Sequence, residues 1–279
     1  MQTIMRETEK LLETLGYVEE PMGLFFTDQQ PEGGYHPKEN TPLTREREEA
    51  GQIDFAGMRD KWSCILGHIR LARKKRDTAW FAADHYGCMG GSFFAGFTNP
   101  ALERNAYFVS TGIPGSGQRG ERYMPSPEAM HVFLADCDAG PAPAKYCVVK
   151  PLSLFTEGEE PLVILFFARP EALFGLTALL WFTTGKTDSI AFPFGAGCTN
   201  IISWPLRFMR DGEDKAVLGA ADLSCRKFMQ PDEMSLAIPL DLYRRMLAAV
   251  PESALPDKSW DEVRKKAARS AAVWGKTEK

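Results

Sequence analysis

The chain has 279 residues, of which 44% are hydrophobic and 25% are charged. These values are ordinary for a globular protein and exclude wholesale disorder. The net charge is -4 and the isoelectric point is near 5.7. Because nucleic-acid-binding proteins usually carry a basic surface, this balance argues against nucleic acid as a partner.

Neither a signal peptide nor a membrane span is expected. The first residues lack the basic and then apolar pattern of a secretory signal. The most apolar stretch, residues 161–182, is interrupted by Arg169, Pro170 and Glu171, whereas a membrane span needs about 20 nearly uncharged residues. We therefore expect a soluble, cytoplasmic protein whose six cysteines are reduced thiols or metal ligands rather than disulfides.

In the N-terminal half, apolar periodicity predicts helices that alternate irregularly with short strands. A helix over residues 3–15 ends at Gly16, and Ser126-Pro127 begins another that runs to about residue 134. Two loops without apolar periodicity, residues 27–52 and 111–126, are long enough to act as lids or binding loops. The remaining elements are a helix over 55–75 and strands over 22–26, 78–86, 107–110 and 146–149.

The C-terminal half continues this mixture. Strands are expected over residues 162–167, 190–194, 217–221 and 235–238, and helices over 172–182, 201–208, 240–250 and 260–274. The irregular alternation favours a mixed α/β (α+β) fold over a doubly wound sheet. We divide the chain into an N-terminal half with long loops, residues 1–155, and a C-terminal half that includes the last helices, residues 156–279. The two halves are expected to pack into one globular unit.

The two halves contain a similar pattern, which predicts an internal repeat. In each half an apolar helical stretch precedes a strand, a Gly-Cys pair follows the strand, and Pro-Leu-x-Leu-aromatic comes later. The Gly-Cys pairs are Gly87-Cys88 and Gly197-Cys198, and the later elements begin at Pro151 and Pro239. If the halves pack about a pseudo-two-fold axis, both thiols face one cleft.

Cys88 and Cys198 each stand where a helix is expected to begin. The backbone N–H groups and the dipole at a helix N-terminus lower the pKa of a thiol, and a neighbouring glycine admits a ligand close to the backbone. The alternative interpretation is a small buried hydrophobic residue at a tight turn. Their recurrence at matched positions makes them candidates for binding an anion, an oxyanion or a metal.

Other cysteines extend this candidate site. Cys64 and His68 lie four residues apart on a predicted helix, so they are candidate ligands of one metal, although the same spacing fits an ordinary core stripe. Cys225 follows a predicted strand of the second half. A four-thiolate set that suits zinc or an iron–sulfur cluster would consist of Cys64, Cys88, Cys198 and Cys225.

Several further motifs have less specific interpretations. No C-x-x-C occurs, and Cys137 and Cys147 are interpreted as structural. Residues 115–120 match G-x-G-x-x-G, but no apolar helix follows, so the segment is interpreted as a flexible loop over the cleft. In that loop Arg119 and Arg122 are candidate anion contacts. A Cys/His nucleophile pair would join Cys88 to His85 or His131.

The order of several short motifs resembles a known family. The motifs are Cys64-x-x-x-His68, Gly87-Cys88-Met89-Gly90-Gly91, Val149-Lys150-Pro151-Leu152, Gly195-Ala196-Gly197-Cys198, Ser224-Cys225-Arg226 and Ala237-Ile238-Pro239. Over residues 10–250 the chain is similar to the family of unknown function numbered 169, also called the uncharacterised ArCR family of archaea and bacteria. The resemblance implies no activity, but it places the cysteines of the family at the four positions named above. Many of its members come from anaerobes, which favours an oxygen-sensitive thiolate site.

We therefore predict a protein that binds a metal or cofactor, an iron–sulfur cluster or zinc, in a cleft between the two halves. The predicted metal ligands are Cys64, Cys88, Cys198 and Cys225, and the predicted cofactor contacts are Gly87, Cys88, Gly90, Gly91, Gly197, Cys198 and Arg226. Two alternatives stay open: a cysteine-dependent enzyme that acts on a small molecule with loop 111–126 as its lid, and a non-catalytic interaction module with cysteines in its core. Neither nucleic acid nor a membrane is an expected partner, and the pattern makes no prediction of the oligomeric state.

Overall fold

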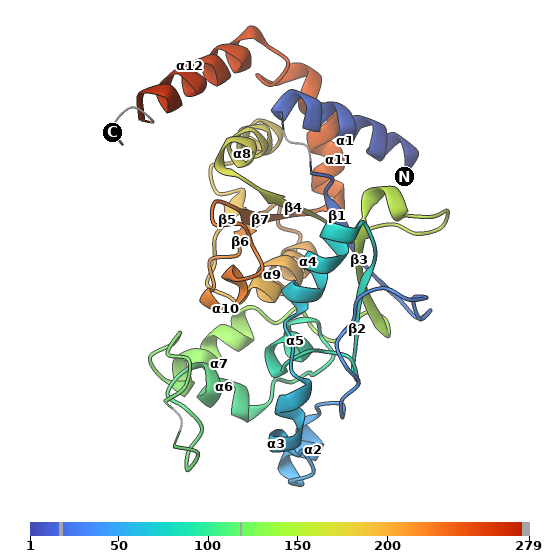
Figure 1. Ribbon diagram of the computed structural model, residues 1–279, viewed down its shortest axis with the longest axis vertical. Helices are drawn as coiled ribbons and strands as arrows, with labels where there is room; N and C mark the ends of the chain where they lie inside the picture. The colour runs from blue at the N-terminus through green and yellow to red at the C-terminus, as the bar shows by residue number, and fades with distance from the viewer. Residues whose placement is uncertain (17–18, 118, 275–279) are drawn as a thin grey trace.

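The computed structural model describes residues 1–16, 19–117 and 119–274. Within these residues, a seven-stranded sheet of order β2-β3-β1-β4-β7-β6-β5 crosses the middle of the molecule (Figure 1). Neighbouring strands are antiparallel except for the parallel pair β5–β6. The strands are β1 Met22–Thr27, β2 Ala79–Ala82, β3 Tyr146–Pro151, β4 Val163–Ala168, β5 Ile190–Ala191, β6 Ala216–Gly219 and β7 Met234–Pro239. The predicted mixed α/β class is confirmed.

The central strand β4 shows why the sheet is covered on both sides. Its six residues are all apolar and all buried. Val163 and Leu165 point into one core, and the alternate residues Ile164 and Phe166 point into another. A strand that is buried on both faces reads as a continuous apolar run rather than as an alternating one.

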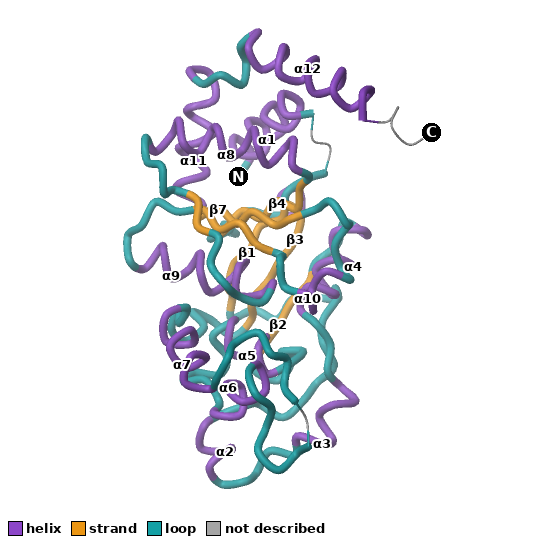
Figure 2. The backbone as a smooth tube through the Cα atoms, turned by 90° about the vertical axis from the view of Figure 1, so that its left-hand side faces the viewer, coloured by secondary structure: helices purple, strands orange, loops and turns teal. Residues whose placement is uncertain are grey.

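One face of the sheet, which we call the α8 face, is covered by the helices that lie uppermost in Figures 1 and 2. These are α1 Gln2–Leu15, α8 Pro170–Thr184 and α11 Leu240–Ala249, with α12 Lys258–Trp274 beyond them. Helix α1 ends as predicted, because Gly16 adopts the left-handed conformation (φ 69°) that favours glycine. The Trp260 indole N–H donates to the Thr14 carbonyl oxygen at 3.0 Å and joins α12 to the end of α1.

The opposite face, which we call the α4 face, is covered by α4 Ile65–Lys75, by a helical run over residues 197–210 and by α10 Leu223–Arg226. The helical run contains a π-helical segment, η3 Thr199–Ser203, followed by α9 Trp204–Arg210. Further from the sheet lie α2 Arg45–Glu49, α3 Phe55–Met58, α5 Met89–Phe94, α6 Glu103–Val109 and α7 Pro127–Asp136 (Figure 2).

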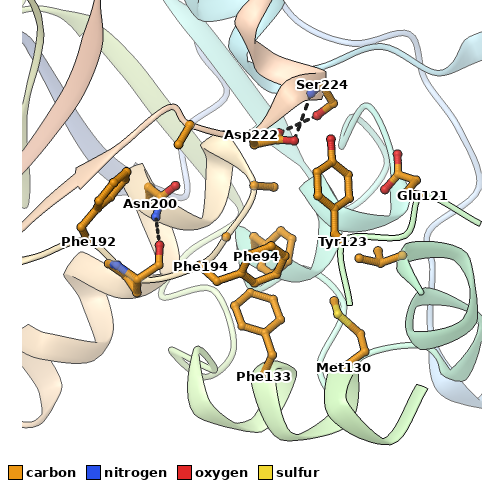
Figure 3. A pocket seen from close by; sticks show the side chains of 15 residues that line it. Phe94, Glu121, Tyr123, Met130, Phe133, Phe192, Phe194, Asn200, Asp222 and Ser224 are labelled. Atoms are coloured by element: carbon orange, nitrogen blue, oxygen red, sulfur yellow. Dashed lines mark hydrogen bonds between the residues drawn. The ribbon is translucent and has the colours of Figure 1, made fainter. Parts of the chain in front are cut away.

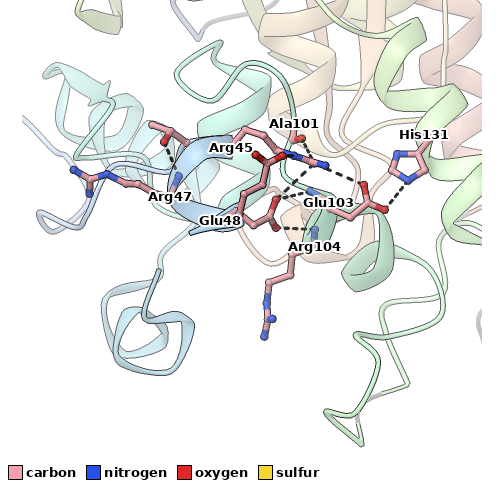
Figure 4. A network of polar contacts seen from close by, with 9 residues as sticks. Arg45, Arg47, Glu48, Ala101, Glu103, Arg104 and His131 are labelled. Carbon is pink, nitrogen blue, oxygen red and sulfur yellow. Dashed lines mark hydrogen bonds and ion pairs between the residues drawn. The ribbon is translucent and has the colours of Figure 1, made fainter. Parts of the chain in front are cut away.

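Three sequence-based predictions of secondary structure are corrected. Of residues 107–110, predicted as a strand, the first three belong to α6 and Ser110 is its C-cap. The helix starts where the Glu48 carboxylate accepts hydrogen bonds from the backbone N–H groups of Glu103 and Arg104 (Figure 4). The predicted helix over residues 55–75 is interrupted between the 3-10 turn η1 Arg59–Lys61 and α4. The helix predicted over residues 201–208 is longer and forms part of the run 197–210, in which Pro205 stands in the first turn of α9, where no N–H is needed.

The predicted strands over residues 78–86 and 190–194 are shorter than expected, since only β2 and β5 pair within them. The polar loop 27–52 contains α2, whose first turn is capped by the Thr44 hydroxyl. The strands are shorter than predicted because apolar content alone does not determine which residues pair by hydrogen bonds.

The two halves of the chain share one sheet, with β1–β3 from residues 1–155 and β4–β7 from residues 156–279. Strand β3 pairs antiparallel with β1, and β7 pairs antiparallel with β4. Each of these two strands, β3 and β7, ends at a proline that is followed by a leucine. The helices before the matched Gly-Cys segments differ, however, because α4 and α8 cover opposite faces of the sheet. The internal repeat therefore stays a prediction.

Candidate functional site

A cavity of about 870 Å³ lies on the α4 face, between α4 and the α5–α7 region. The cysteines predicted to act together all line it: Cys64, Cys88, Cys198 and Cys225. They come from four separate segments of the chain, and the tertiary structure brings them to one place. We call this space the thiol cavity.

Each thiol is placed by the start of a helix or by a short helix. Cys64 and Cys88 are the N-cap residues of α4 and α5, and both are partly exposed. Cys198 lies in the first turn of the run 197–210, and Cys225 lies within α10; both are buried. Cys64 and Cys88 are thus the more exposed two residues of the set, and Cys198 and Cys225 are the more buried two.

Gly87 holds the Cys88 segment against the Cys64 segment. Its φ of 80° favours glycine, and its carbonyl oxygen accepts a hydrogen bond from the Ser63 N–H at 3.1 Å. A Cβ at this position would lie 2.8 Å from the Ser63 carbonyl oxygen. The glycine is therefore required for the close approach of the two segments that carry Cys64 and Cys88.

The other predicted glycines also allow close packing. A Cβ on Gly197 would lie 3.1 Å from Cys225 Sγ, so this glycine lets the Cys198 segment pass beside Cys225. A Cβ on Gly91 would collide with the Tyr86 carbonyl oxygen. Gly90 and Gly197 line the thiol cavity, whereas Gly87 and Gly91 are not lining residues.

Arg226 has a position different from the one that a ligand contact would need. Its guanidinium donates hydrogen bonds of 2.6–3.1 Å to carbonyl oxygens of the loop that follows α10 and of the turn that precedes it. It is not among the residues that line the thiol cavity. The side chain stabilises the segment that carries Cys225; the accepting carbonyls belong to Ala220, Gln230, Pro231 and Glu233.

The predicted lowering of the thiol pKa values is wrong. The Gly91 N–H does donate to Cys88 Sγ at 3.3 Å, and this contact lowers the Cys88 pKa. Burial outweighs it and raises the pKa of Cys88 to about 11 and that of Cys225 to about 12. Burial likewise raises the pKa of Cys64 and takes the pKa of Cys198 well above its ordinary value.

The thiols also influence one another. A charge on Cys64 raises the pKa of each of the other three, and a charge on Cys88 raises that of Cys198. Cys64 therefore lies within electrostatic range of the other three thiols, and Cys88 lies within range of Cys198. Without a bound cation the four thiols are therefore protonated at neutral pH.

No preformed site for a single ion is found: across the ranges 1–16, 19–117 and 119–274, no three His, Cys, Asp or Glu side chains are grouped closely enough to hold one. His68 does line the thiol cavity, but its Nε2 pairs with Ser63 Oγ at 2.9 Å. Burial, with a smaller effect of His36, lowers the His68 pKa to about 4, so the ring is neutral. Cys64 caps α4 rather than lying within it, which changes the i, i+4 geometry predicted for this pair.

The two histidines considered as partners of Cys88 lie elsewhere. His131 Nε2 contacts Glu103 Oε1 at 3.1 Å on the exposed side of α7 (Figure 4). His85 Nδ1 contacts Asp84 Oδ1 at 2.8 Å, and its ring packs beside Trp80. Neither histidine lines the thiol cavity, so the nucleophile pair with Cys88 is not formed.

Sequence reasoning missed the charged residues of the cavity. Glu121 and Asp222 line one part of it, and three basic residues from α4 and the end of α10 also line it: Arg70, Lys74 and Lys227. The arginines predicted to contact an anion, Arg119 and Arg122, are exposed and are not lining residues. The sequence signal that could have found Glu121 is the glycine- and proline-rich composition of loop 111–126, to which this residue belongs.

The fold and the site together define a mixed α/β protein with a cysteine-lined cavity beside its sheet. The model of the uncharacterised ArCR family, DUF169, matches residues 10–249, and the chain belongs to that family. No curated protein and no solved structure matches the chain. No helix among its described residues is both long enough and apolar enough to cross a membrane.

Proposed function

We propose that this protein binds a metal–thiolate cofactor in the thiol cavity, with Cys64, Cys88, Cys198 and Cys225 as ligands. The observation that carries the proposal is the presence of all four thiols in the wall of one 870 Å³ cavity, although they are far apart in the sequence. The two cysteines interpreted as structural, Cys137 and Cys147, are buried and are not lining residues.

The electrostatics of the thiols support a cationic ligand. Burial and mutual repulsion keep them protonated, as their raised pKa values show. A coordinated thiol loses its proton outright, so binding of a metal releases protons and becomes stronger as pH rises. The basic side chains of Arg70, Lys74 and Lys227 line the same cavity and offset part of the negative charge of four thiolates.

A set of four thiolates suits either zinc or an iron–sulfur cluster. Four thiolates bound to one zinc at about 2.3 Å must stand within roughly 4 Å of one another. The described residues contain no group of His, Cys, Asp or Glu side chains already placed to hold an ion, so binding of either form requires the thiols to move together. An iron–sulfur cluster is the form of the cofactor that we propose, and the metal and sulfide analysis below distinguishes it from zinc.

A cysteine-dependent enzyme is the second candidate, favoured by the position of Cys88, a partly exposed residue, in the wall of a large cavity. Such an enzyme needs a thiolate in the resting protein. The Cys88 pKa of about 11 opposes this role. The thiol-reactivity measurement in the Discussion separates the two candidates.

The test is iron and acid-labile sulfide analysis with a visible spectrum. The full-length protein is purified without oxygen and without an affinity tag, before and after reconstitution with ferrous iron and sulfide. We expect stoichiometric iron and sulfide in the wild type and their loss from the double variant Cys88→Ala/Cys198→Ala. The matched control is Cys137→Ala/Cys147→Ala, which removes two buried thiols outside the cavity and is expected to keep the cofactor.

Protein that stays colourless and metal-free after reconstitution would contradict the proposal. The same conclusion would follow if the cavity double variant retained its metal. A result of stoichiometric zinc without sulfide, with the zinc lost on the same substitutions, would support the same four ligands but would show that they bind a single ion instead of a cluster.

A further inference from the structure

A second, smaller cavity of about 230 Å³ adjoins the thiol cavity (Figure 3). The two share lining residues, among them Phe94, Glu121 and Asp222. Loop 111–126, α7 and the segment after β5 provide most of the remaining wall. We call this space the aromatic cavity.

Aromatic rings from several elements surround this space. The ring centroids of Phe133 and Phe194 are 4.9 Å apart at 72°, those of Phe94 and Phe133 are 6.2 Å apart, and those of Tyr123 and Phe194 are 6.3 Å apart. The Trp204 indole N–H donates to the Phe194 carbonyl oxygen at 3.1 Å and holds this segment in place. Phe194 is still 40% exposed, so part of its surface is available to a ligand.

The polar part of the wall is acidic. Asp222 is buried, and its carboxylate accepts hydrogen bonds from the N–H and hydroxyl of Ser224. Glu121 lies beside Tyr123 and is also a lining residue of this cavity (Figure 3). Among the described residues no basic side chain forms an ion pair with either carboxyl, and no Lys, Arg or His lines the aromatic cavity.

We propose that the aromatic cavity binds a small organic cation of the alkylammonium class. Aromatic faces attract a cation through their negative quadrupole, and ammonium ligands are commonly recognised by cages of such rings. The Glu121 carboxyl supplies the opposite charge, because Asp222 already accepts hydrogen bonds from protein groups. The volume suffices, since an engineered cavity of about 150 Å³ already admits benzene.

This inference does not depend on the metal–thiolate cofactor. An anion would be repelled by two carboxyls that have no basic partner in the described structure. A neutral apolar ligand would fill the space but would leave Glu121 without a counter-charge. These alternatives make different predictions for a charged ligand and a neutral ligand of the same shape.

The test is calorimetric titration of the full-length protein with choline and with its uncharged isostere, 3,3-dimethylbutan-1-ol. We expect saturable binding of choline and at least fivefold weaker binding of the alcohol. Glu121→Gln is expected to weaken choline binding about fivefold and to leave binding of the alcohol unchanged. Its backbone N–H, which donates to the Phe108 carbonyl oxygen at 2.9 Å, is retained.

Glu157→Gln is the matched control, since Glu157 is exposed on the loop after β3 and does not line either cavity. A second variant, Phe194→Leu, keeps an apolar side chain but removes the π face, and we expect about threefold weaker choline binding. The double variant Cys88→Ala/Cys198→Ala is expected to bind choline as the wild type does. Equal affinity for choline and the alcohol, unchanged choline binding by Glu121→Gln, or absence of saturable choline binding would each overturn the proposal.

Discussion

On the α8 face of the sheet, three helices close over an apolar core, whereas on the α4 face the helices leave two cavities. Two buried hydroxyls of the α8 face pair with each other, since Thr8 Oγ1 and Tyr243 Oη are 2.8 Å apart. On the α4 face, Trp62 Nε1, His68 Nδ1 and Thr199 Oγ1 are buried with no hydrogen-bond partner among the described residues. Such atoms cost about 1–3 kcal/mol each.

The comparison indicates a division of roles between the two faces. The α8 face has an apolar core in which the hydroxyls of Thr8 and Tyr243 pair with each other, and this core serves stability. The α4 face keeps protonated thiols, acidic side chains and unpaired polar atoms around open space, which is the arrangement expected of a binding site. The following predictions test this division, from the largest effect to the smallest.

Leu176→Ala tests the α8 face. Leu176 is completely buried on α8, in the core of the α8 face. Its truncation leaves a cavity and is expected to lower the free energy of unfolding by about 2–5 kcal/mol. The measurement is urea unfolding followed by circular dichroism. Iron and sulfide content per folded molecule should stay as in the wild type, and a parallel loss of cofactor would break the proposed division.

Alkylation of the thiols tests the α4 face. With a pKa of about 11, Cys88 has about 100-fold less thiolate at pH 8 than a thiol of ordinary pKa near 9. We expect its alkylation in cofactor-free protein, followed by mass spectrometry, to be slower by about this factor and to accelerate as pH rises towards 11. Fast alkylation at pH 8 would instead favour the cysteine-dependent enzyme.

Gly87→Ala tests the contact between the Cys64 and Cys88 segments. The new Cβ would lie 2.8 Å from the Ser63 carbonyl oxygen at a φ of 80°, and we expect a loss of about 1–3 kcal/mol in stability together with reduced cofactor content. Gly115→Ala is the matched control. Gly115 has a φ of 75°, but nothing lies within 4 Å of its Cβ position, so it carries the backbone strain without the collision. Equal effects of both variants would show that the collision is unimportant.

The pH dependence of choline binding tests the acidic wall. Glu121 is exposed as a whole residue, but desolvation of its carboxyl, with a smaller contribution from Asp222, raises its pKa to about 7. The carboxyl is therefore largely neutral at pH 6 and charged at pH 8, and choline binding is expected to strengthen up to about fivefold between these values. Asp222 and Tyr123 face the same space, so the Glu121→Gln variant provides the reference. A pH dependence of equal size in that variant would assign the effect to another group.

Local patterns were sufficient for several elements of the fold. The end of α1 at Gly16 and the start of α7 at Ser126 were predicted correctly, because each capping residue acts within one turn of its own helix. The apolar run of β4 was recognised because both of its faces are buried. The order of the motifs also grouped the four cysteines that the structure brings to one cavity.

Tertiary structure alone decided what depends on distant neighbours. Residues 107–109 are helical partly because Glu48, more than 50 residues earlier, caps the start of α6. The thiol pKa values rise because burial outweighs the helix N-terminus, and burial is a property of the folded molecule. Glu121 and Asp222 face one space only after loop 111–126 and the start of α10 come together. Local sequence determines caps and apolar runs, whereas solvation and charge pairing depend on which distant segments meet.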